Sequence, residues 1–144
     1  MKLLVINGPN LNFLGIREPE VYGTETYADL VSMIREKAEE VNCEIEVFQS
    51  NHEGAIIDRI QAAYSDGTQG IVINPGAFTH YSYAIHDALQ SITTMPKAEI
   101  HISDITKREG FRAVSVTKPA CDDQIYGKGF AGYLLAIDRV LALA

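Results

Sequence analysis

The sequence predicts an α/β protein in which a doubly wound sheet of five parallel strands is covered by helices on both faces. Short apolar runs alternate along the chain with longer segments in which apolar residues recur at helical spacing. This alternation is typical of parallel sheets with helices on both faces. The 144 residues, 47% of them hydrophobic, suit one domain and contain no linker or internal repeat.

The strands are predicted from short runs rich in aliphatic residues. Lys2–Ile6 is predicted to be a buried strand, because it is almost wholly apolar. In Glu44–Phe48, Ile45 and Val47 alternate with acidic residues, as expected for a strand with one polar face. The predicted strands are Lys2–Ile6, Glu44–Phe48, Gly70–Ile73, Ala98–Ser103 and Ala113–Thr117.

The helices are predicted from apolar residues three and four positions apart. Thr26, followed three residues later by Asp29, resembles a capping box and marks the start of the first helix. Further helices are predicted around residues 56–64 and 84–92, and Tyr133–Ala144 closes the chain as a helix. Five strands without a linker favour a single flavodoxin-like domain over residues 1–144.

Composition and charge exclude several classes of protein. The net charge of −7 argues against a nucleic-acid-binding surface, so an anionic ligand would need local arginines or backbone N–H groups. No apolar run approaches the roughly 20 residues that span a bilayer, and the apolar N-terminus is too short for a signal peptide. Cys43 and Cys121 are too few for a disulfide framework and match no zinc spacing. We therefore expect a cytoplasmic protein with reduced thiols, no bound metal and no membrane partner.

Polar, charged and glycine residues gather where the predicted strands end. Ligands in open α/β sheets bind beyond the carboxyl ends of the strands, so these segments should converge on one site. They are Asn7–Asn12, Gly15, Arg17 and Tyr22 after the first strand, Asn74–His80 after the third, and Glu99–Ser103, Arg108 and Arg112 at and after the fourth.

The first of these loops covers roughly residues 7–25, whereas βα loops usually have about 2–6 residues. One interpretation is a flexible surface loop, and turn chemistry explains Asn7-Gly8-Pro9 well. It does not explain Arg17 and Tyr22 in the same loop, which favour a lid over the site.

Glu99 and His101 are two residues apart in a predicted strand, so both side chains point to one face. A carboxylate beside an imidazole fixes its tautomer and supports the protonated ring that a general acid needs. The alternative is an ordinary polar face on an edge strand. The position at a strand end favours the functional interpretation.

His80 follows a glycine-containing turn and precedes a helix, where N–H groups could bind an anion or a hydroxyl. A histidine that merely caps the helix is about equally consistent with the sequence. No role is predicted for His52 or His86.

Gly127–Gly132 formally matches the dinucleotide fingerprint G-x-G-x-x-G. The motif requires a further strand with an acidic residue about 20 residues later, and the chain is too short for one. We interpret these glycines as close packing before the last helix.

Three blocks of residues together resemble the type II 3-dehydroquinate dehydratases, in order and spacing from residue 1 to the final helix. The blocks are Asn7 to Asn12 with Gly15, Arg17-Glu18-Pro19 and Tyr22-Gly23; Asn74 to Ala77 with Thr79-His80; and Glu99 to Ser103 with Arg108 and Arg112. Phe78, where a tyrosine is common, and the charged stretch Lys118 to Lys128 depart from the family pattern without touching a catalytic position.

The resemblance implies a flavodoxin-like fold and anti elimination of water from 3-dehydroquinate through an enol or enolate, giving 3-dehydroshikimate in the shikimate route to aromatic amino acids. It implies no metal and no organic cofactor. The catalytic positions that it implies are Tyr22 as base, His101 as acid with Glu99 beside it, Arg17 as the lid arginine and Asn10 near the enolate. The implied substrate-binding positions are Asn74, His80, Ile102, Ser103 and Arg112.

The resemblance also implies that Asp87 reaches the site of a neighbouring subunit, in a trimer-based homo-oligomer that is commonly a dodecamer. The alternative for a lone aspartate is a solvated charge on a helix.

Two other classes of function are consistent with the bulk features. One is a nucleotide-binding or small-molecule-binding module on the same fold, because fold alone does not fix function. The other is a structural assembly protein that shows no turnover. The three motif blocks fit neither of them.

Overall fold

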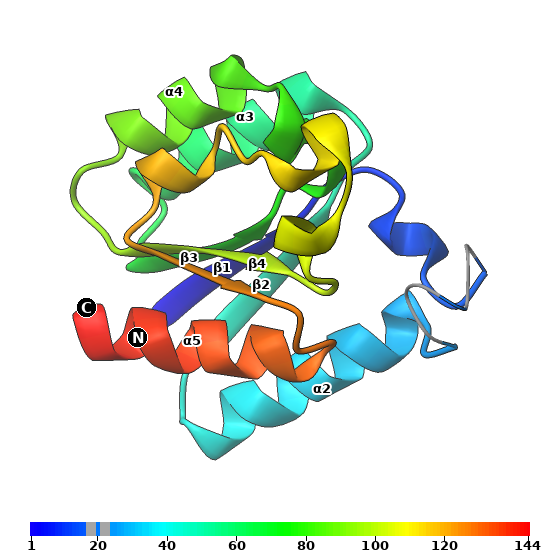
Figure 1. Cartoon of the computed structure of the whole chain (residues 1–144). Coiled ribbons are helices and arrows are strands. Elements are labelled where there is room, and N and C mark those ends of the chain that lie inside the picture. Colours follow the sequence, from blue (N-terminus) through cyan, green and yellow to red (C-terminus); the bar gives the residue numbers. More distant parts are fainter. Residues whose placement is uncertain (17–19, 21–23) are drawn as a thin grey trace.

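The computed structural model describes residues 1–16, 20 and 24–144. Its five strands form one parallel sheet with the order β2-β1-β3-β4-β5. This order confirms the predicted doubly wound α/β fold (Figure 1). The strands are β1 (Lys2–Asn7), β2 (Glu44–Gln49), β3 (Gly70–Asn74), β4 (Lys97–His101) and β5 (Asp123–Tyr126).

Helices cover both faces of the sheet. On one face lie α2 (Tyr27–Glu40) and α5 (Ala131–Leu143), and on the other lie α3 (Glu53–Ala63) and α4 (Tyr83–Ser91) (Figure 1). Among the described residues no helix has the length and hydropathy needed to cross a membrane.

The start of α2 is fixed by the capping box that the sequence predicted. The Thr26 hydroxyl accepts from the backbone N–H of Asp29 at 3.1 Å, and the Asp29 carboxylate accepts from the N–H of Thr26 at 2.9 Å. These bonds satisfy N–H groups that a helix leaves without intrahelical partners.

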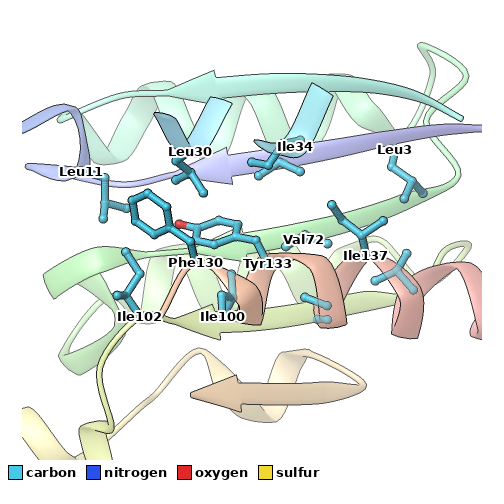
Figure 2. Close-up of a cluster of buried hydrophobic side chains, with 14 of the residues drawn as sticks. Leu3, Leu11, Leu30, Ile34, Val72, Ile100, Ile102, Phe130, Tyr133 and Ile137 are labelled. Carbon is cyan, nitrogen blue, oxygen red and sulfur yellow. The ribbon is translucent and has the colours of Figure 1, made fainter. Parts of the chain in front are cut away.

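Two apolar layers hold the helices on the sheet. Successive residues of β1 alternate between them: Leu3 and Val5 pack in the layer under α2 and α5, whereas Leu4 and Ile6 pack under α3 and α4. Figure 2 shows the first layer, in which Tyr133 of α5 lies among aliphatic side chains of the sheet and of α2.

The prediction of a fifth strand at Ala113–Thr117 is wrong, because the backbone groups of this segment bond to other elements instead of a neighbouring strand. Val116 N–H donates to the Thr79 carbonyl at 2.7 Å. The carbonyls of Val114 and Val116 accept from Nδ1 of His80 and His86, each at 2.8 Å. The segment thus crosses the α4 side of the sheet, and its first residue, Ala113, is the last residue of a short 3₁₀ helix, η4 (Gly110–Ala113).

The true fifth strand, β5, pairs with β4 at the edge of the sheet. The predicted fourth strand, Ala98–Ser103, is also shifted, because β4 runs over Lys97–His101. Ile102 and Ser103 therefore follow the strand directly.

Of the three glycines at 127–132, Gly127 and Gly129 lie between β5 and α5, and Gly129 faces open space; only Gly132, the second residue of α5, clearly serves the close packing that the sequence predicted. A Cβ atom on Gly132 would collide with the side chain of Ile100 in β4. The absence of a side chain there lets the start of α5 lie close against the sheet.

Candidate active site

One cavity opens at the carboxyl ends of β1, β3 and β4, where the sequence predicted that three segments would converge. The loop after β1, the turn after β3 and the end of β4 all contribute to its wall. The described lining residues are Pro9, Asn10, Leu11, Asn74, Gly76, Ala77, His80, His101, Ile102, Ser103, Ile105, Arg108 and Arg112.

The loops after β1 and β3 fit closely because each contributes a glycine at their contact. A Cβ atom on Gly8 would collide with the Pro75 carbonyl, and one on Gly76, whose φ is +60°, would lie 3.1 Å from the Pro9 carbonyl oxygen. Gly8 N–H also donates to the Asn74 carbonyl at 2.8 Å. The two loops therefore form one wall of the cavity.

Asn10 lines this wall in the left-handed conformation, with φ of 69°, which asparagine tolerates better than most residues. Its backbone N–H donates to Asn51 Oδ1 at 3.0 Å. Leu11 and Leu14 pack into the core, so the first part of the long loop is anchored. Arg17 and Tyr22, on which the predicted lid depends, lie outside the described residues.

The side chain of Asn74 is fixed by a buried polar chain at the end of the sheet. Its Nδ2 donates to the hydroxyl of Tyr133 at 2.9 Å, and its Oδ1 accepts from Gly76 N–H at 3.1 Å. Tyr133 in turn donates to Asn7 Oδ1 at 2.7 Å. Burial raises the pKa of Tyr133, so its hydroxyl keeps its proton and can make this bond.

Glu99 and His101 form a buried hydrogen-bonded pair at the end of β4. His101 Nε2 lies 2.8 Å from Glu99 Oε2, and Glu99 has no exposed surface. Because β4 lies between β3 and β5, the alternative of a polar face on an edge strand is wrong. An ionised carboxylate only accepts, so Nε2 carries a proton and Nδ1 is the ring nitrogen left for the cavity.

Several donors keep Glu99 ionised. Burial acts to raise the pKa of its carboxyl, but the net shift is downward, and the hydrogen bond and positive charge of His101 contribute most to the lowering. Hydrogen bonds from Thr117 and Gln124 lower the pKa of Glu99 further. The carboxyl is therefore a carboxylate at neutral pH, which supports a positive charge on His101.

His80 reaches the cavity from η2 (Gly76–His80), the 3₁₀ helix after β3. Its Nδ1 bonds to the Val114 carbonyl rather than to a helix end, so the helix-capping alternative is wrong. Burial lowers its pKa, an effect that the bond to Val114 opposes and that the positive charges of His101 and Arg112 reinforce. His80 is thus a neutral ring whose Nε2 is an acceptor.

Arg112 and Arg108 both line the cavity and place positive charge beside it, although the chain as a whole has a net charge of −7. The Arg112 guanidinium lies 4.9 Å from the centre of the Phe111 ring, and that ring packs edge-on against His80 at 5.6 Å. The two arginines can attract an anionic ligand locally against the unfavourable overall field.

Of the predicted site residues that the structure describes, all but Glu99 and Asp87 line this cavity. Glu99 lies directly behind His101, whereas Asp87 is exposed on α4 and does not line the cavity of its own chain. Sequence reasoning missed Ser115, Thr117 and Gln124, whose side chains donate to Glu99.

No group of three His, Cys, Asp or Glu side chains among the described residues is arranged to hold a metal ion. The fold and the cavity define a class: α/β proteins with a cavity at the carboxyl ends of the strands, lined by arginines and by a histidine bonded to a buried carboxylate.

Comparison with known proteins identifies the family within this class. Residues 1–141 match the Dehydroquinase class II family, and the chain belongs to that family. It is 61% identical over 144 residues to a 3-dehydroquinate dehydratase of Lachnospira eligens, an alignment that covers 100% of this chain and 98% of that protein. Enzymes of this kind are hydro-lyases, and the protein is accordingly a hydro-lyase.

Solved structures agree with this assignment. The type II dehydroquinase from Butyrivibrio crossotus superposes with a TM-score of 0.97 at 62% identity, covering 98% of this chain and 97% of that one. The type II dehydroquinase from Propionibacterium acnes superposes with a TM-score of 0.92 at 43% identity, covering 99% and 97% of the two chains.

Proposed function

We propose that the protein, acting as a single domain over residues 1–144, removes water from 3-dehydroquinate and gives 3-dehydroshikimate in the shikimate route to aromatic amino acids. The observation that carries the proposal is His101, held by the buried carboxylate of Glu99 and lining a cavity that also contains Arg112. The cavity thus combines a proton donor with positive charge for an anionic substrate. The substrate named for the relatives is such an anion.

In the proposed reaction Tyr22, as tyrosinate, takes a proton from the carbon beside the ketone. The electron pair of that C–H bond forms an enolate, which hydrogen-bond donors near its oxygen stabilise. The enolate then collapses, the C–O bond to the departing hydroxyl breaks, and His101 protonates that hydroxyl as it leaves as water. After one turnover Tyr22 has gained a proton and His101 has lost one. Tyr22 must therefore lose its proton, and His101 must regain one, before the next cycle.

Tyrosine is an unusual base, because a pKa near 10 leaves about 0.1% tyrosinate at pH 7. A nearby cation lowers that pKa by roughly 1–3 units, and Arg17 in the same loop could supply it. Two other tyrosines near the site are unsuited to this role, because burial raises the pKa of both Tyr27 and Tyr133. The candidate base is Tyr22, the position that the family resemblance implies.

The remaining lining residues are proposed to bind and orient the substrate. Asn10 donates near the enolate oxygen, and Arg112 attracts the substrate's carboxylate. His80 accepts a hydrogen bond from a substrate hydroxyl through Nε2. The other proposed substrate-binding positions are Asn74, Ile102 and Ser103.

The proposed route uses neither a metal or organic cofactor nor a lysine Schiff base. Lys97 is the buried lysine nearest to Glu99 in the sequence, and burial lowers its pKa. Its Nζ donates to the Ile92 carbonyl, and it does not line the cavity. We expect turnover to be indifferent to chelators and to borohydride added with substrate. A reduced lysine–substrate adduct, detected by mass spectrometry, would rule out this route.

The direct test is to incubate the purified protein with 3-dehydroquinate and follow the ultraviolet absorbance of the conjugated product. Tyr22→Phe should lower kcat far more than it weakens binding, because it removes a group needed in the transition state. Arg17→Ala should act likewise through the lost pKa shift of Tyr22. A wild-type protein without turnover would refute the proposal, and near-normal turnover in Tyr22→Phe would place the base elsewhere.

We further propose a cytoplasmic homo-oligomer built from trimers, commonly a dodecamer in this family, in which Asp87 serves the site of a neighbouring subunit. Asp87 is exposed on α4, away from the cavity of its own chain. Tyr22→Phe and Asp87→Ala subunits, each of low activity, can be unfolded and refolded together. The mixed oligomer should exceed the summed activity of its parents, because some sites regain both residues. Additive activity after verified co-assembly would refute the role of Asp87.

A further inference from the structure

Besides His101, the carboxylate of Glu99 is contacted by side chains from the 115–117 segment and from β5. Ser115 Oγ and Gln124 Nε2 lie 2.8 Å and 2.7 Å from Glu99 Oε2. The Thr117 hydroxyl donates to the other carboxylate oxygen, Oε1. The hydroxyl of Thr79 lies behind them, 2.7 Å from Ser115 Oγ and 2.8 Å from Thr117 Oγ1.

Proton counting fixes the direction of these hydrogen bonds. Each hydroxyl has one proton, and an ionised carboxylate can only accept. Ser115 and Thr117 therefore direct their protons to Glu99, and neither has a second proton for Thr79. Thr79 donates to one of these two hydroxyls, while the amide nitrogen of Gln124 is a donor only. Ser115, Thr117 and Gln124 thus each donate to Glu99, and Thr79 donates to one of the two hydroxyls, an arrangement that suits a carboxylate and disfavours a protonated carboxyl.

We propose that Thr117, Ser115 and Gln124, supported by Thr79, are positioning residues for the dehydration, because they hold Glu99 as a carboxylate with Oε2 aimed at His101 Nε2. None of the four lines the cavity, so they act through Glu99 and not on the substrate. The inference rests on the proposed function, in which His101 is the general acid. With Nε2 committed to Glu99, the remaining nitrogen, Nδ1, is the one that can protonate the departing hydroxyl.

Few other titratable groups compete for Glu99 among the described residues. His101 contacts it on the same strand, and Ile73, its partner on β3, is apolar. Cys121 also senses the charge of Glu99, but burial raises the pKa of its thiol, which is therefore neutral. Lys97 shares the strand face but donates to the Ile92 carbonyl. The neutral donors and His101 are thus what stabilise this carboxylate.

Thr117→Val tests the proposal, because valine keeps the shape of threonine and removes the donor. Its matched control is Thr68→Val. Thr68 is also buried, with 6% of its surface exposed, and its hydroxyl lies 2.6 Å from the Asp66 carboxylate. Thr68 lies just before the amino end of β3, whereas the cavity opens at the carboxyl ends of the strands. Both changes remove a threonine hydroxyl from a carboxylate, and only one of the carboxylates contacts His101.

Thr117→Val should lower kcat by about threefold to tenfold, since a hydrogen bond to a charged group is lost. KM should stay within about twofold of wild type, because no substrate contact changes. The pKa of Glu99 should rise, so the acid limb of the pH–kcat profile should move to higher pH. Thr68→Val should change none of these quantities.

A second measurement follows the carboxyl itself by ¹³C NMR of glutamate-labelled protein, with the Glu99 signal assigned by its loss in Glu99→Gln. Its titration midpoint should rise in Thr117→Val and also in Gln124→Met, which serves if the first variant fails to fold. An unchanged midpoint in the folded variants overturns the proposal. A shifted midpoint with wild-type kcat overturns the link to the reaction. If the wild-type protein does not convert 3-dehydroquinate, the proposed function fails, and a shifted midpoint shows that the hydrogen bonds themselves are as described.

Discussion

Two histidines face the same cavity from different elements and differ in the group that holds each ring. His101, at the end of β4, directs Nε2 to the Glu99 carboxylate, whereas His80, at the end of η2, directs Nδ1 to the Val114 carbonyl; both distances are 2.8 Å. A carboxylate stabilises a positive ring through its charge, whereas a neutral carbonyl mainly fixes the tautomer. The comparison teaches that the partner, and not the residue type, suits one histidine to proton transfer and the other to neutral hydrogen bonding.

The comparison predicts the largest effect at His101. His101→Ala should lower kcat by about 10²–10⁴-fold, the usual cost of losing a general acid. Steady-state kinetics on 3-dehydroquinate would measure it, with substrate binding determined separately. If His80→Ala lowered kcat by as much as His101→Ala, the assignment of separate roles would be wrong.

His80 should mainly affect substrate binding. His80→Ala should raise KM by about tenfold, since a buried hydrogen bond to substrate is lost, with a much smaller change in kcat. The matched control is His86→Ala, because His86 also donates from Nδ1 to a carbonyl, that of Val116 at 2.8 Å, but does not line the cavity. An equal rise of KM in both variants would mean that His80 only supports the 114–116 segment.

The smallest predicted effect concerns stability and depends on pH. The pKa of Glu99 is lowered in the folded protein, so its ionisation contributes stability above the ordinary value of 4.5, which is lost as pH falls through the lowered pKa. Glu99→Gln should therefore cost about 1–3 kcal/mol near neutral pH, and the difference should shrink in acid. Urea unfolding of both proteins between pH 3 and pH 8 would measure this. If the difference in unfolding free energy were constant with pH, the surroundings of Glu99 would not lower the pKa of its carboxyl.

The strand ends, and with them most of the site, could be predicted from the sequence. The convergence of the segments at Asn10, Asn74 and His101 follows from the rule that parallel strands share a carboxyl edge. The pairing of Glu99 with His101 follows from the two-residue period of a strand.

The donors around Glu99 could not be predicted, because their contacts join elements whose positions the sequence does not reveal. Gln124 contacts Glu99 because β5 pairs with β4. The sequence does not predict β5 as a strand, because the residues of this edge strand are mostly polar. The alternating residues of 113–117 resemble a strand, and in the structure two of their polar side chains, Ser115 and Thr117, reach the same carboxylate. The two-residue alternation therefore correctly indicated that Ser115 and Thr117 share one side of the segment. It did not reveal which element that side contacts.

The most direct test of the general-acid role of His101 uses a substrate that does not need an acid. In 3-dehydroquinate whose departing hydroxyl is replaced by fluorine, fluoride can leave without being protonated. Comparing kcat of wild type and His101→Ala on both substrates isolates the proton transfer. The account predicts a defect of about 10²–10⁴-fold with 3-dehydroquinate and one of about tenfold or less with the fluorinated substrate. Equal defects with both substrates would contradict it, because His101 would then be needed for something other than protonating the leaving group.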